Sequence, residues 1–379
     1  MLNGSTTARH YATGQPIRVQ WENGLITGVE PWQGELPDDI WIAPALVDLQ
    51  VNGYAGVDFQ SEGLTSAELL KAVDGLRADG CTRFLLTLIT DEWPKLISRL
   101  RHLRSTRKEN ATLRNAIAGW HIEGPFLSPE PGYHGAHNPA VMLDPTPDHV
   151  RELRAAASDD PLLLTLAPER AGAIEAIGLA ASIGIAVSLG HTNASFEVLN
   201  QAVRAGATGF THLGNACPQQ LDRHDNILWR ALDTPGLTVG LIADRIHVSP
   251  SLFRLIHRAL GHESIYYTTD AMSAAGAPPG RYRVGNLELE VGADQIVRQP
   301  GRTNFAGSAL SPIQGVFRAA EMLDRPWQEV WDAFSSRPAN FMHLPTGIAV
   351  GHSAHFCLLT VRAARLIDLR VYAPGSMQS

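Results

Sequence analysis

The sequence predicts an α/β fold class: a (β/α)8 TIM-type barrel with a small β-sandwich domain built from both chain termini. Two observations lead to this prediction. From about Leu46 onward, eight short apolar runs alternate with amphipathic segments, and both ends of the chain carry alternating apolar patterns typical of strands. Parallel strands require helical crossovers, and eight strand–helix units are the number that closes a barrel.

The predicted strands are short apolar runs that end in small or polar residues. An open, doubly wound sheet is the competing arrangement, but such a sheet usually carries a phosphate or dinucleotide loop. Neither GxGxxG nor GxxxxGK[ST] occurs in the sequence. The eight runs read LVDLQVNG, RFLLTLIT, AIAGWHIEG, PLLLTLAPE, IAVSLGHT, GFTHLGNA, LTVGLIAD and SIYYTTDA.

Amphipathic segments between these runs are the predicted crossover helices. Residues 65–80, 171–184 and 195–207 place apolar side chains at three- and four-residue intervals, and a glycine follows the last turn of each. This spacing gives one apolar helix face, and glycine is the usual residue just beyond a helix end.

The two termini are predicted to pair into one small β domain. Residues 16–31 carry an Asn-Gly turn between alternating apolar runs, which indicates a hairpin, and residues 354–375 also have strand character. The predicted domains are therefore 1–44 and 345–379 for the two parts of the β domain, and 45–344 for the barrel. Proline-marked junctions, WIAPALVD and FMHLPTGI, lie near both boundaries.

Composition excludes several classes of protein. Of 379 residues, 44% are hydrophobic and 18% charged, the net charge is −7, and no Lys/Arg-rich run occurs. These values indicate a globular chain and argue against a nucleic-acid partner. No signal-peptide pattern or bilayer-length apolar stretch is present, and the three scattered cysteines exclude a disulfide framework. A cytoplasmic protein without membrane contact is expected.

Residues able to bind a metal or move protons follow five of the predicted strands. Barrel active sites lie at the C-terminal ends of the strands. Two imidazoles and one carboxylate leave a coordination position open for water, which suits catalytic Zn²⁺, with Fe²⁺ and Co²⁺ as alternatives. A further carboxylate beside that water is the natural proton carrier. The five residues are Glu123, His191, His212, His247 and Asp270.

At these positions the sequence resembles the N-acetylglucosamine-6-phosphate deacetylases of the amidohydrolase superfamily. The matching segments follow one another through most of the barrel. They are PALVDLQVNGYAG, HIEGPF with GAHNP, SLGHTNA, THLGNA, GLIADRIHV, TTDAMSAAG and FAGSAL.

The resemblance implies a role for each of the strand-end residues. Glu123, His191 and His212 become the metal ligands, Asp270 the acid and base, and His247 the group that polarises the acetamide carbonyl. The reaction implied is hydrolysis of N-acetyl-D-glucosamine 6-phosphate to D-glucosamine 6-phosphate and acetate.

The resemblance also implies a single divalent ion in each subunit. Many amidohydrolases carry His-x-His at the end of the first barrel strand, whereas this chain has Gln50 and Asn52, and neutral amides are poor ligands for transition metals. These two residues, with His121, are expected around the ligands. For His121, which shares a strand face with Glu123, core packing is an equal alternative.

Substrate contacts and a homodimer follow from the same resemblance. It implies that Arg223 reaches the phosphate bound in the neighbouring subunit. Around that arginine the sequence departs from the family, and ADRIH places Arg245 beside the pocket, where a guanidinium could bind phosphate. The remaining implied contacts are Ala136, His137, Asn215, Ala216, Ala306, Gly307 and Ser308.

Several alternatives stay open at this point. The substrate could be unphosphorylated N-acetylglucosamine or N-acetylgalactosamine 6-phosphate, since the surroundings of Arg223 differ from the family pattern. A cyclic amidase or deaminase is an alternative within the superfamily. A sugar-binding protein without catalytic activity is an alternative of another class.

Overall fold

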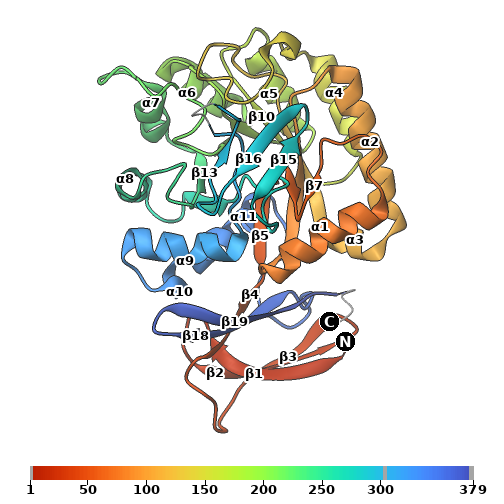
Figure 1. Cartoon of the computed structure of the whole chain (residues 1–379), viewed down its shortest axis with the longest axis vertical. Helices are drawn as coiled ribbons and strands as arrows, with labels where there is room; N and C mark the ends of the chain where they lie inside the picture. Colours follow the sequence, from red (N-terminus) through yellow and green to blue (C-terminus); the bar gives the residue numbers. More distant parts are fainter. Residues whose placement is uncertain (1–2, 302–304, 375–379) are drawn as a thin grey trace.

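Eight parallel strands, each followed by helical or irregular chain, form the larger body of the protein (Figure 1). The structure is a computed structural model, and it describes residues 3–301 and 305–374. Within these ranges the strands pair in sequence order, so each new strand adds beside the last. They are β5 (Leu46–Val51), β8 (Cys81–Ile89), β9 (Ile117–Glu123), β10 (Leu162–Leu166), β11 (Ala186–Leu189), β12 (Gly209–Phe210), β13 (Thr238–Ile242) and β14 (Ile265–Thr268).

The first and last strands, β5 and β14, meet at a seam that nearly closes the barrel. Val51, the last residue of β5, forms a parallel bridge with Ala271, just beyond β14, and the Asn52 N–H donates to the Ala271 carbonyl at 2.7 Å. The predicted fold class, a (β/α)8 barrel beside a terminal β unit, is confirmed. Seven of the eight predicted apolar runs contain a whole strand, and RFLLTLIT contains all of β8 except Cys81 and Thr82.

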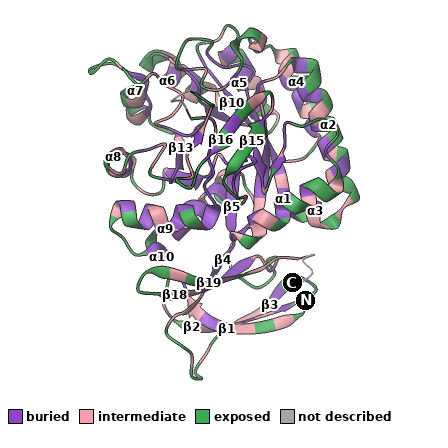
Figure 2. Cartoon of the chain, viewed as in Figure 1, coloured by how far each residue is buried: buried purple, intermediate pink, exposed green. Residues whose placement is uncertain are grey.

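Helices surround the barrel, and Figure 2 shows that their outer faces are exposed while the strands are buried. The predicted segments 65–80, 171–184 and 195–207 contain α1, α5 and α6. The helices are α1 (Ser66–Ala78), α2 (Trp93–Glu109), α3 (Ala111–Ala116), α4 (Pro147–Ala157), α5 (Ala173–Ser182), α6 (Phe196–Ala205), α7 (Ile227–Asp233), α8 (Pro250–Leu260), α9 (Pro312–Leu323), α10 (Trp327–Val330) and α11 (Ser336–Phe341), with 3₁₀ turns η1 (Pro139–Val141) and η2 (Trp331–Phe334).

Local chemistry fixes the ends of these helices. Thr65 and Glu68 form a reciprocal capping box at the start of α1, which satisfies backbone N–H groups that have no partner within the helix. At the end of α6, Gly206 adopts φ +118°, a conformation that costs glycine little and other residues more. The apolar face between these ends, for example Leu69, Val73 and Leu76 of α1, is buried.

Both termini contribute to one mixed sheet beside the barrel (Figure 1). The strand order is β19-β18-β4-β1-β2-β3, and the sheet curls so that Trp21 meets the rings of Phe356 at 5.3 Å and Tyr372 at 5.2 Å. The small β domain is thus a single continuous sheet with its core inside the curl. Its strands are β1 (Gly4–His10), β2 (Pro16–Glu22), β3 (Leu25–Pro31), β4 (Ile40–Pro44), β18 (Phe356–Arg362) and β19 (Arg365–Tyr372).

The predicted Asn-Gly hairpin joins β2 to β3. Asn23 has φ +51° and Gly24 has φ +77°, and positive φ at both central residues is what a two-residue type I′ turn requires.

Two small sheets were not among the predicted elements. The hairpin of β6 (Gly53–Tyr54) and β7 (Val57–Asp58) follows the first barrel strand, and β15 (Gly280–Val284), β16 (Leu287–Val291) and β17 (Val297–Arg298) follow the last. Leu289 and Val297 of this second sheet share an apolar cluster with Met272 and Ala306. The sheet therefore packs on the chain that flanks the end of β14.

No helix in residues 3–301 and 305–374 is long and apolar enough to cross a membrane.

The cysteines Cys81, Cys217 and Cys357 carry free thiols, and two of them are buried.

Candidate active site

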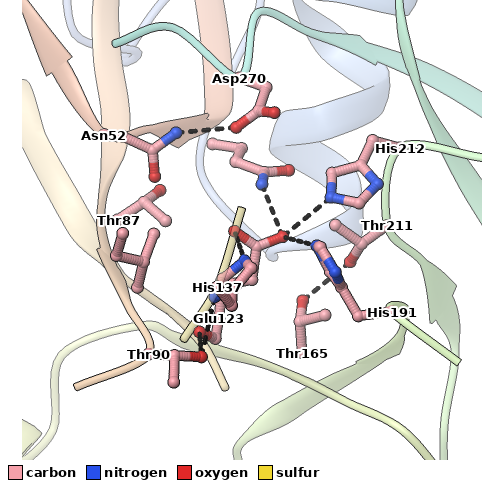
Figure 3. Close-up of polar contacts among 12 residues, drawn as sticks. Asn52, Thr87, Thr90, Glu123, His137, Thr165, His191, Thr211, His212 and Asp270 are labelled. Atoms are coloured by element: carbon pink, nitrogen blue, oxygen red, sulfur yellow. Dashed lines mark hydrogen bonds and ion pairs between the residues drawn. The ribbon is translucent and has the colours of Figure 1, made fainter. Parts of the chain in front are cut away.

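The five residues singled out at strand ends lie at or just beyond the C-terminal ends of the barrel strands. Glu123 is the last residue of β9, His191 and His212 follow β11 and β12, and Asp270 follows β14. Because all strands run in the same direction, these positions surround one end of the barrel. Figure 3 shows that the side chains of Glu123, His191 and His212 turn toward one another, with Asp270 nearby.

Three of these residues have an unusual backbone conformation. His191, His212 and Asp270 have φ values of +51°, +32° and +51°. Residues other than glycine rarely adopt this left-handed region, and each costs on the order of 1–3 kcal/mol that surrounding contacts must offset. Hydrogen bonds hold all three carbonyls: Ser128 N–H donates to His191 O (3.0 Å), Asn215 N–H to His212 O (3.1 Å) and Ser308 N–H to Asp270 O (2.8 Å).

Glu123, His191 and His212 form a compact, buried group. His212 Nε2 lies 2.9 Å and His191 Nε2 lies 3.3 Å from the same carboxylate oxygen, Glu123 Oε1. One candidate ligand atom from each residue lies within 4.8 Å of the others. Side chains this close must share a proton or a cation, because a buried carboxylate without a positive partner is costly.

The contacts behind this group orient its ligand atoms. His191 Nδ1 lies 2.9 Å from the Tyr133 carbonyl, which can only accept, so Nδ1 carries the proton and the Nε2 lone pair faces Glu123. A metal-binding histidine usually donates its other N–H in this way. Gln50 Nε2 donates to Glu123 Oε1 at 3.0 Å. The donor set of one carboxylate and two imidazoles fits a divalent transition metal.

The electrostatics of the group favour an ionised Glu123. Burial raises the pKa of the Glu123 carboxyl, but its contacts with the imidazoles of His137, His191 and His212 oppose burial and hold that pKa well below its usual range. Burial lowers the pKa of His191 to about 4, so this ring is neutral near pH 7 and can act as a ligand.

Asp270 lies beside the group in a different environment. Burial raises the pKa of the Asp270 carboxyl to about 6, and the negative charge of Glu123 adds to this effect. Asn52 Nδ2 donates to Asp270 Oδ1 at 2.7 Å, as Figure 3 shows. A carboxyl group with a pKa this close to neutrality can both accept and donate a proton.

His247 is held by a residue that the sequence prediction missed. Asp244 is only 4% exposed, and its Oδ2 lies 2.6 Å from His247 Nδ1. The signal was present in the sequence as an acid three residues before the histidine, but this spacing is common in turns and does not by itself identify a pair.

His137 is the predicted substrate residue that lies next to the metal-binding group. Its Nδ1 hydrogen-bonds Thr90 Oγ1 at 2.8 Å, its Nε2 lies 3.6 Å from Glu123 Oε2, and its ring is 4.4 Å from that of His191. Thr90, at the end of β8, is a second residue that the sequence reasoning missed. The half-buried Ala136 precedes His137 in the same loop.

Other predicted substrate residues follow the ligands along the chain. Asn215 Nδ2 donates to the His212 carbonyl at 3.2 Å, and Ala216 has φ +50°. Ser308 Oγ donates to the Thr269 carbonyl at 2.5 Å, so the segment of Ala306, Gly307 and Ser308 lies directly against the chain that carries Asp270.

Three predicted residues make no hydrogen bond or ion pair with this group among the described residues. Arg223 is exposed on the loop between β12 and α7. Arg245 forms an ion pair with Glu321 of α9. His121 is buried within the barrel, where its Nε2 lies 2.8 Å from Thr165 Oγ1, and burial lowers its pKa to about 4.

Comparison with known proteins gives a consistent result. No model of a protein family matches the chain. The N-acetylglucosamine-6-phosphate deacetylase of Danio rerio is 32% identical over 351 residues, which cover 87% of this chain and 84% of the relative. The deacetylase of the same name from Bacillus subtilis (strain 168) is 29% identical over 315 residues, 82% of this chain and 78% of the relative.

Solved structures of similar proteins superpose on this chain over nearly its full length. An N-acetyl-D-glucosamine-6-phosphate deacetylase mutant from Mycobacterium smegmatis, in complex with N-acetyl-D-glucosamine-6-phosphate, superposes with a TM-score of 0.87 at 28% identity and 99% coverage of both chains. The enzyme from Thermotoga maritima gives 0.80 at 25% identity, with 94% of this chain and 93% of that chain covered. The chain therefore belongs to the N-acetylglucosamine-6-phosphate deacetylase family of the amidohydrolase superfamily.

Proposed function

We propose that this chain hydrolyses N-acetyl-D-glucosamine 6-phosphate to D-glucosamine 6-phosphate and acetate. The family relationship supports this activity, and one observation carries it: Glu123, His191 and His212 converge within 4.8 Å, and the half-buried carboxyl group of Asp270 interacts with their charges. A non-catalytic sugar-binding protein would need no such combination of ligand group and proton carrier.

We infer that Glu123, His191 and His212 hold one divalent ion in each subunit, with Zn²⁺ as the proposed metal. A divalent ion bound to this group supplies Lewis acidity, which lowers the pKa of a water molecule and polarises a carbonyl. Fe²⁺ and Co²⁺ accept the same ligands. Elemental analysis of the purified protein decides between them, and a sample with full activity and no transition metal would contradict this assignment.

In the proposed reaction Asp270 moves the proton. It accepts a proton from the water molecule that attacks the acetamide carbonyl, and it then donates that proton to the nitrogen as the C–N bond breaks. The nitrogen must be protonated to leave as an amine. Asn52 keeps the carboxyl group in place through its 2.7 Å hydrogen bond.

His247 is the proposed partner of the carbonyl oxygen. It polarises this oxygen as the carbon becomes tetrahedral, so negative charge that develops there is stabilised. We assign His137, with the backbone at Ala136, to the acetyl group or the sugar. The backbone of Asn215 and Ala216, and the segment Ala306 to Ser308, are assigned to the walls of the sugar pocket.

We further propose a homodimer in which Arg223 reaches the phosphate bound in the partner subunit. Its exposure on a loop supports this role, and Trp229 of α7, whose Nε1 donates to the Arg223 carbonyl at 3.3 Å, remains 45% exposed. Large apolar side chains on one face suit a subunit interface.

A subunit-complementation experiment tests the dimer. Arg223→Ala and Asp270→Asn should each be nearly inactive as homodimers, but a heterodimer has one site with both residues intact. When equal amounts of the two variants exchange subunits at random, half of the dimers are heterodimers, and each of these has one intact site of two. The mixture should therefore regain about a quarter of wild-type activity. No recovery in a sample that contains heterodimers would contradict a role across the interface.

Unphosphorylated N-acetylglucosamine is the second candidate substrate. The ion pair between Arg245 and Glu321 favours it, because that guanidinium already has a carboxylate partner within this subunit. Acetate release should be measured over a panel of free and 6-phosphorylated N-acetylglucosamine and N-acetylgalactosamine. Loss of a charge-assisted phosphate contact should lower kcat/KM by roughly 10- to 100-fold, since such contacts contribute ~1.5–3 kcal/mol. Equal values for both forms would support the second candidate.

We also propose that the protein works in the cytoplasm, a reducing compartment. Its free thiols are compatible with this location.

A further inference from the structure

Asp244, just after β13, has no part in the reaction as described, yet it is a buried carboxylate beside the site. Its two oxygens have separate partners. Oδ2 lies 2.6 Å from His247 Nδ1, and Oδ1 accepts the backbone N–H groups of Ile246 and His247, both at 2.8 Å. One carboxylate therefore holds both the imidazole ring and the turn that carries it.

These contacts decide which ring nitrogen faces the substrate. Burial raises the pKa of Asp244, but the hydrogen bond and charge of His247 oppose burial, and the pKa lies below its usual value. Asp244 is therefore ionised near pH 7 and can only accept hydrogen bonds. His247 Nδ1 must carry a proton to make its contact, which leaves Nε2 as the nitrogen available to the site.

Further contacts fix the same turn from outside. The ring of Phe305 lies 5.2 Å from the ring of His247 at 59°. Arg318 of α9 donates through Nη1 to the Asp244 carbonyl at 3.4 Å, and the neighbouring Arg245 pairs with Glu321 of the same helix. Both links tie the Asp244–His247 turn to α9.

We propose that Asp244 is a positioning residue that sets the tautomer and direction of His247 for carbonyl polarisation. This inference rests on the role proposed above for His247. The nearest chemical parallel is the aspartate of a serine-protease triad, which holds its histidine in the tautomer that the reaction requires.

The variant Asp244→Asn tests this role with little change in volume. If the asparagine oxygen keeps the two backbone N–H groups, its NH₂ group faces Nδ1, and that nitrogen can no longer carry a proton. We expect kcat to fall by about 100-fold, in line with the large effect of the wrong tautomer in such pairs, while metal content and Tm stay near wild type.

Asp58→Asn is the matched control. Asp58 also accepts backbone N–H groups, from Gln60 at 3.0 Å and Gly285 at 2.8 Å, but no imidazole contacts it in the described residues. Its kcat should stay within about twofold of wild type, because no group of the proposed reaction depends on it.

A double-mutant cycle with His247→Gln separates positioning from general structure. If Asp244 acts through His247, Asp244→Asn should cause no further loss in the His247→Gln background. An equal loss in both backgrounds would overturn the proposal, and so would wild-type activity of His247→Gln.

The protonation state of His247 can be measured on the wild-type enzyme, so this test requires no variant. Two-dimensional ¹H–¹⁵N spectra of the holoenzyme near pH 7 should show His247 Nδ1 protonated, and an unprotonated Nδ1 would overturn the proposal. This readout does not depend on acetate release. Failure of the proposed deacetylation would instead appear as absence of acetate from the wild-type enzyme.

Discussion

Glu123 is a buried carboxyl group and Asp270 is a half-buried one whose charge interacts with it, and their surroundings give the two groups opposite properties. Three imidazoles keep Glu123 ionised, whereas burial and the charge of Glu123 raise the pKa of Asp270 to about 6. A pair of acids whose environments separate their pKa values can divide ligand and proton-transfer roles between them.

Asp270→Asn should keep the metal and lose most of kcat. An amide can still accept the hydrogen bond of Asn52, but it cannot accept a proton from water or donate one to the leaving nitrogen. General acid–base catalysis contributes about 10²- to 10⁴-fold, so a loss in that range is expected. Steady-state acetate release and elemental analysis of the same sample provide the measurement. Near-normal turnover would rule out the assigned role.

The rate should also fall at acid pH. Protonation of Asp270 removes the base, so kcat/KM should decrease as pH drops through the pKa of this group, about 6 in this structure. A cation at the neighbouring ligands favours the carboxylate and moves the acid limb lower. We therefore expect a midpoint at or below about pH 6 in a pH–rate profile, absent from the residual activity of Asp270→Asn. A midpoint above about pH 7 would be inconsistent with this assignment.

At the scale of elements, strands β5 and β14 depend on a side chain to complete their seam. Asp48 of β5 is fully buried, and its carboxylate accepts the hydroxyls of Thr268 at 2.5 Å and Thr269 at 2.6 Å, as well as the Thr269 N–H at 3.1 Å. This cluster joins the two strands where the regular ladder of backbone hydrogen bonds is interrupted.

Asp48→Ala should destabilise the barrel at this seam. The substitution leaves buried donors on Thr268 and Thr269 without an acceptor, and each such group costs ~1–3 kcal/mol. The free energy of unfolding, measured by urea titration, should fall by about 3 kcal/mol. Asp48→Asn retains one oxygen acceptor and should lose less. A loss in Asp48→Asn greater than that in Asp48→Ala would contradict this account.

A helix or strand could be predicted when the sequence pattern that indicates it lies within its own residues. The eight barrel strands and helices α1, α5 and α6 follow from apolar periodicity, because each buries one face or run against a common core. The sheet of β15, β16 and β17 was missed although residues 280–291 alternate around a Gly-Asn turn. Its strands pair mainly with each other and bury few residues, so their pattern is weak.

At the scale of the whole molecule, the proposed metal ties together strands distant in sequence. Glu123 comes from β9, while His191 and His212 come from the ends of β11 and β12. An ion bound only by the folded barrel stabilises it by RT ln(1 + [M]/Kd), which is about 4 kcal/mol at a thousandfold excess over Kd.

Metal removal should therefore reduce stability as well as activity. Treatment with a chelator should abolish acetate release and lower the Tm by several degrees, and added Zn²⁺ should restore both. Glu123→Gln, which loses a charged ligand, should show little change in Tm with either treatment. An unchanged Tm for the chelated wild-type enzyme, with metal shown to be absent, would contradict binding at this group.

The division of the chain at 44/45 and 344/345 stays a prediction. The described sheets are compatible with it, since β4 ends at Pro44 and β5 begins at Leu46. Both termini pair within one sheet through β4 and β18, and this pairing requires both parts of the unit.

The sequence by itself determined the order and type of the main elements, the residue types at the strand ends and the family, because periodicity and motifs are properties of neighbouring residues. Only the tertiary structure decided which side chains meet. It joined His247 to Asp244, His137 to Thr90 and Asp48 to Thr268 of β14, and it paired Arg245 with Glu321 of α9. Such contacts depend on how strands far apart in the chain are placed around the barrel, and local patterns do not contain that placement.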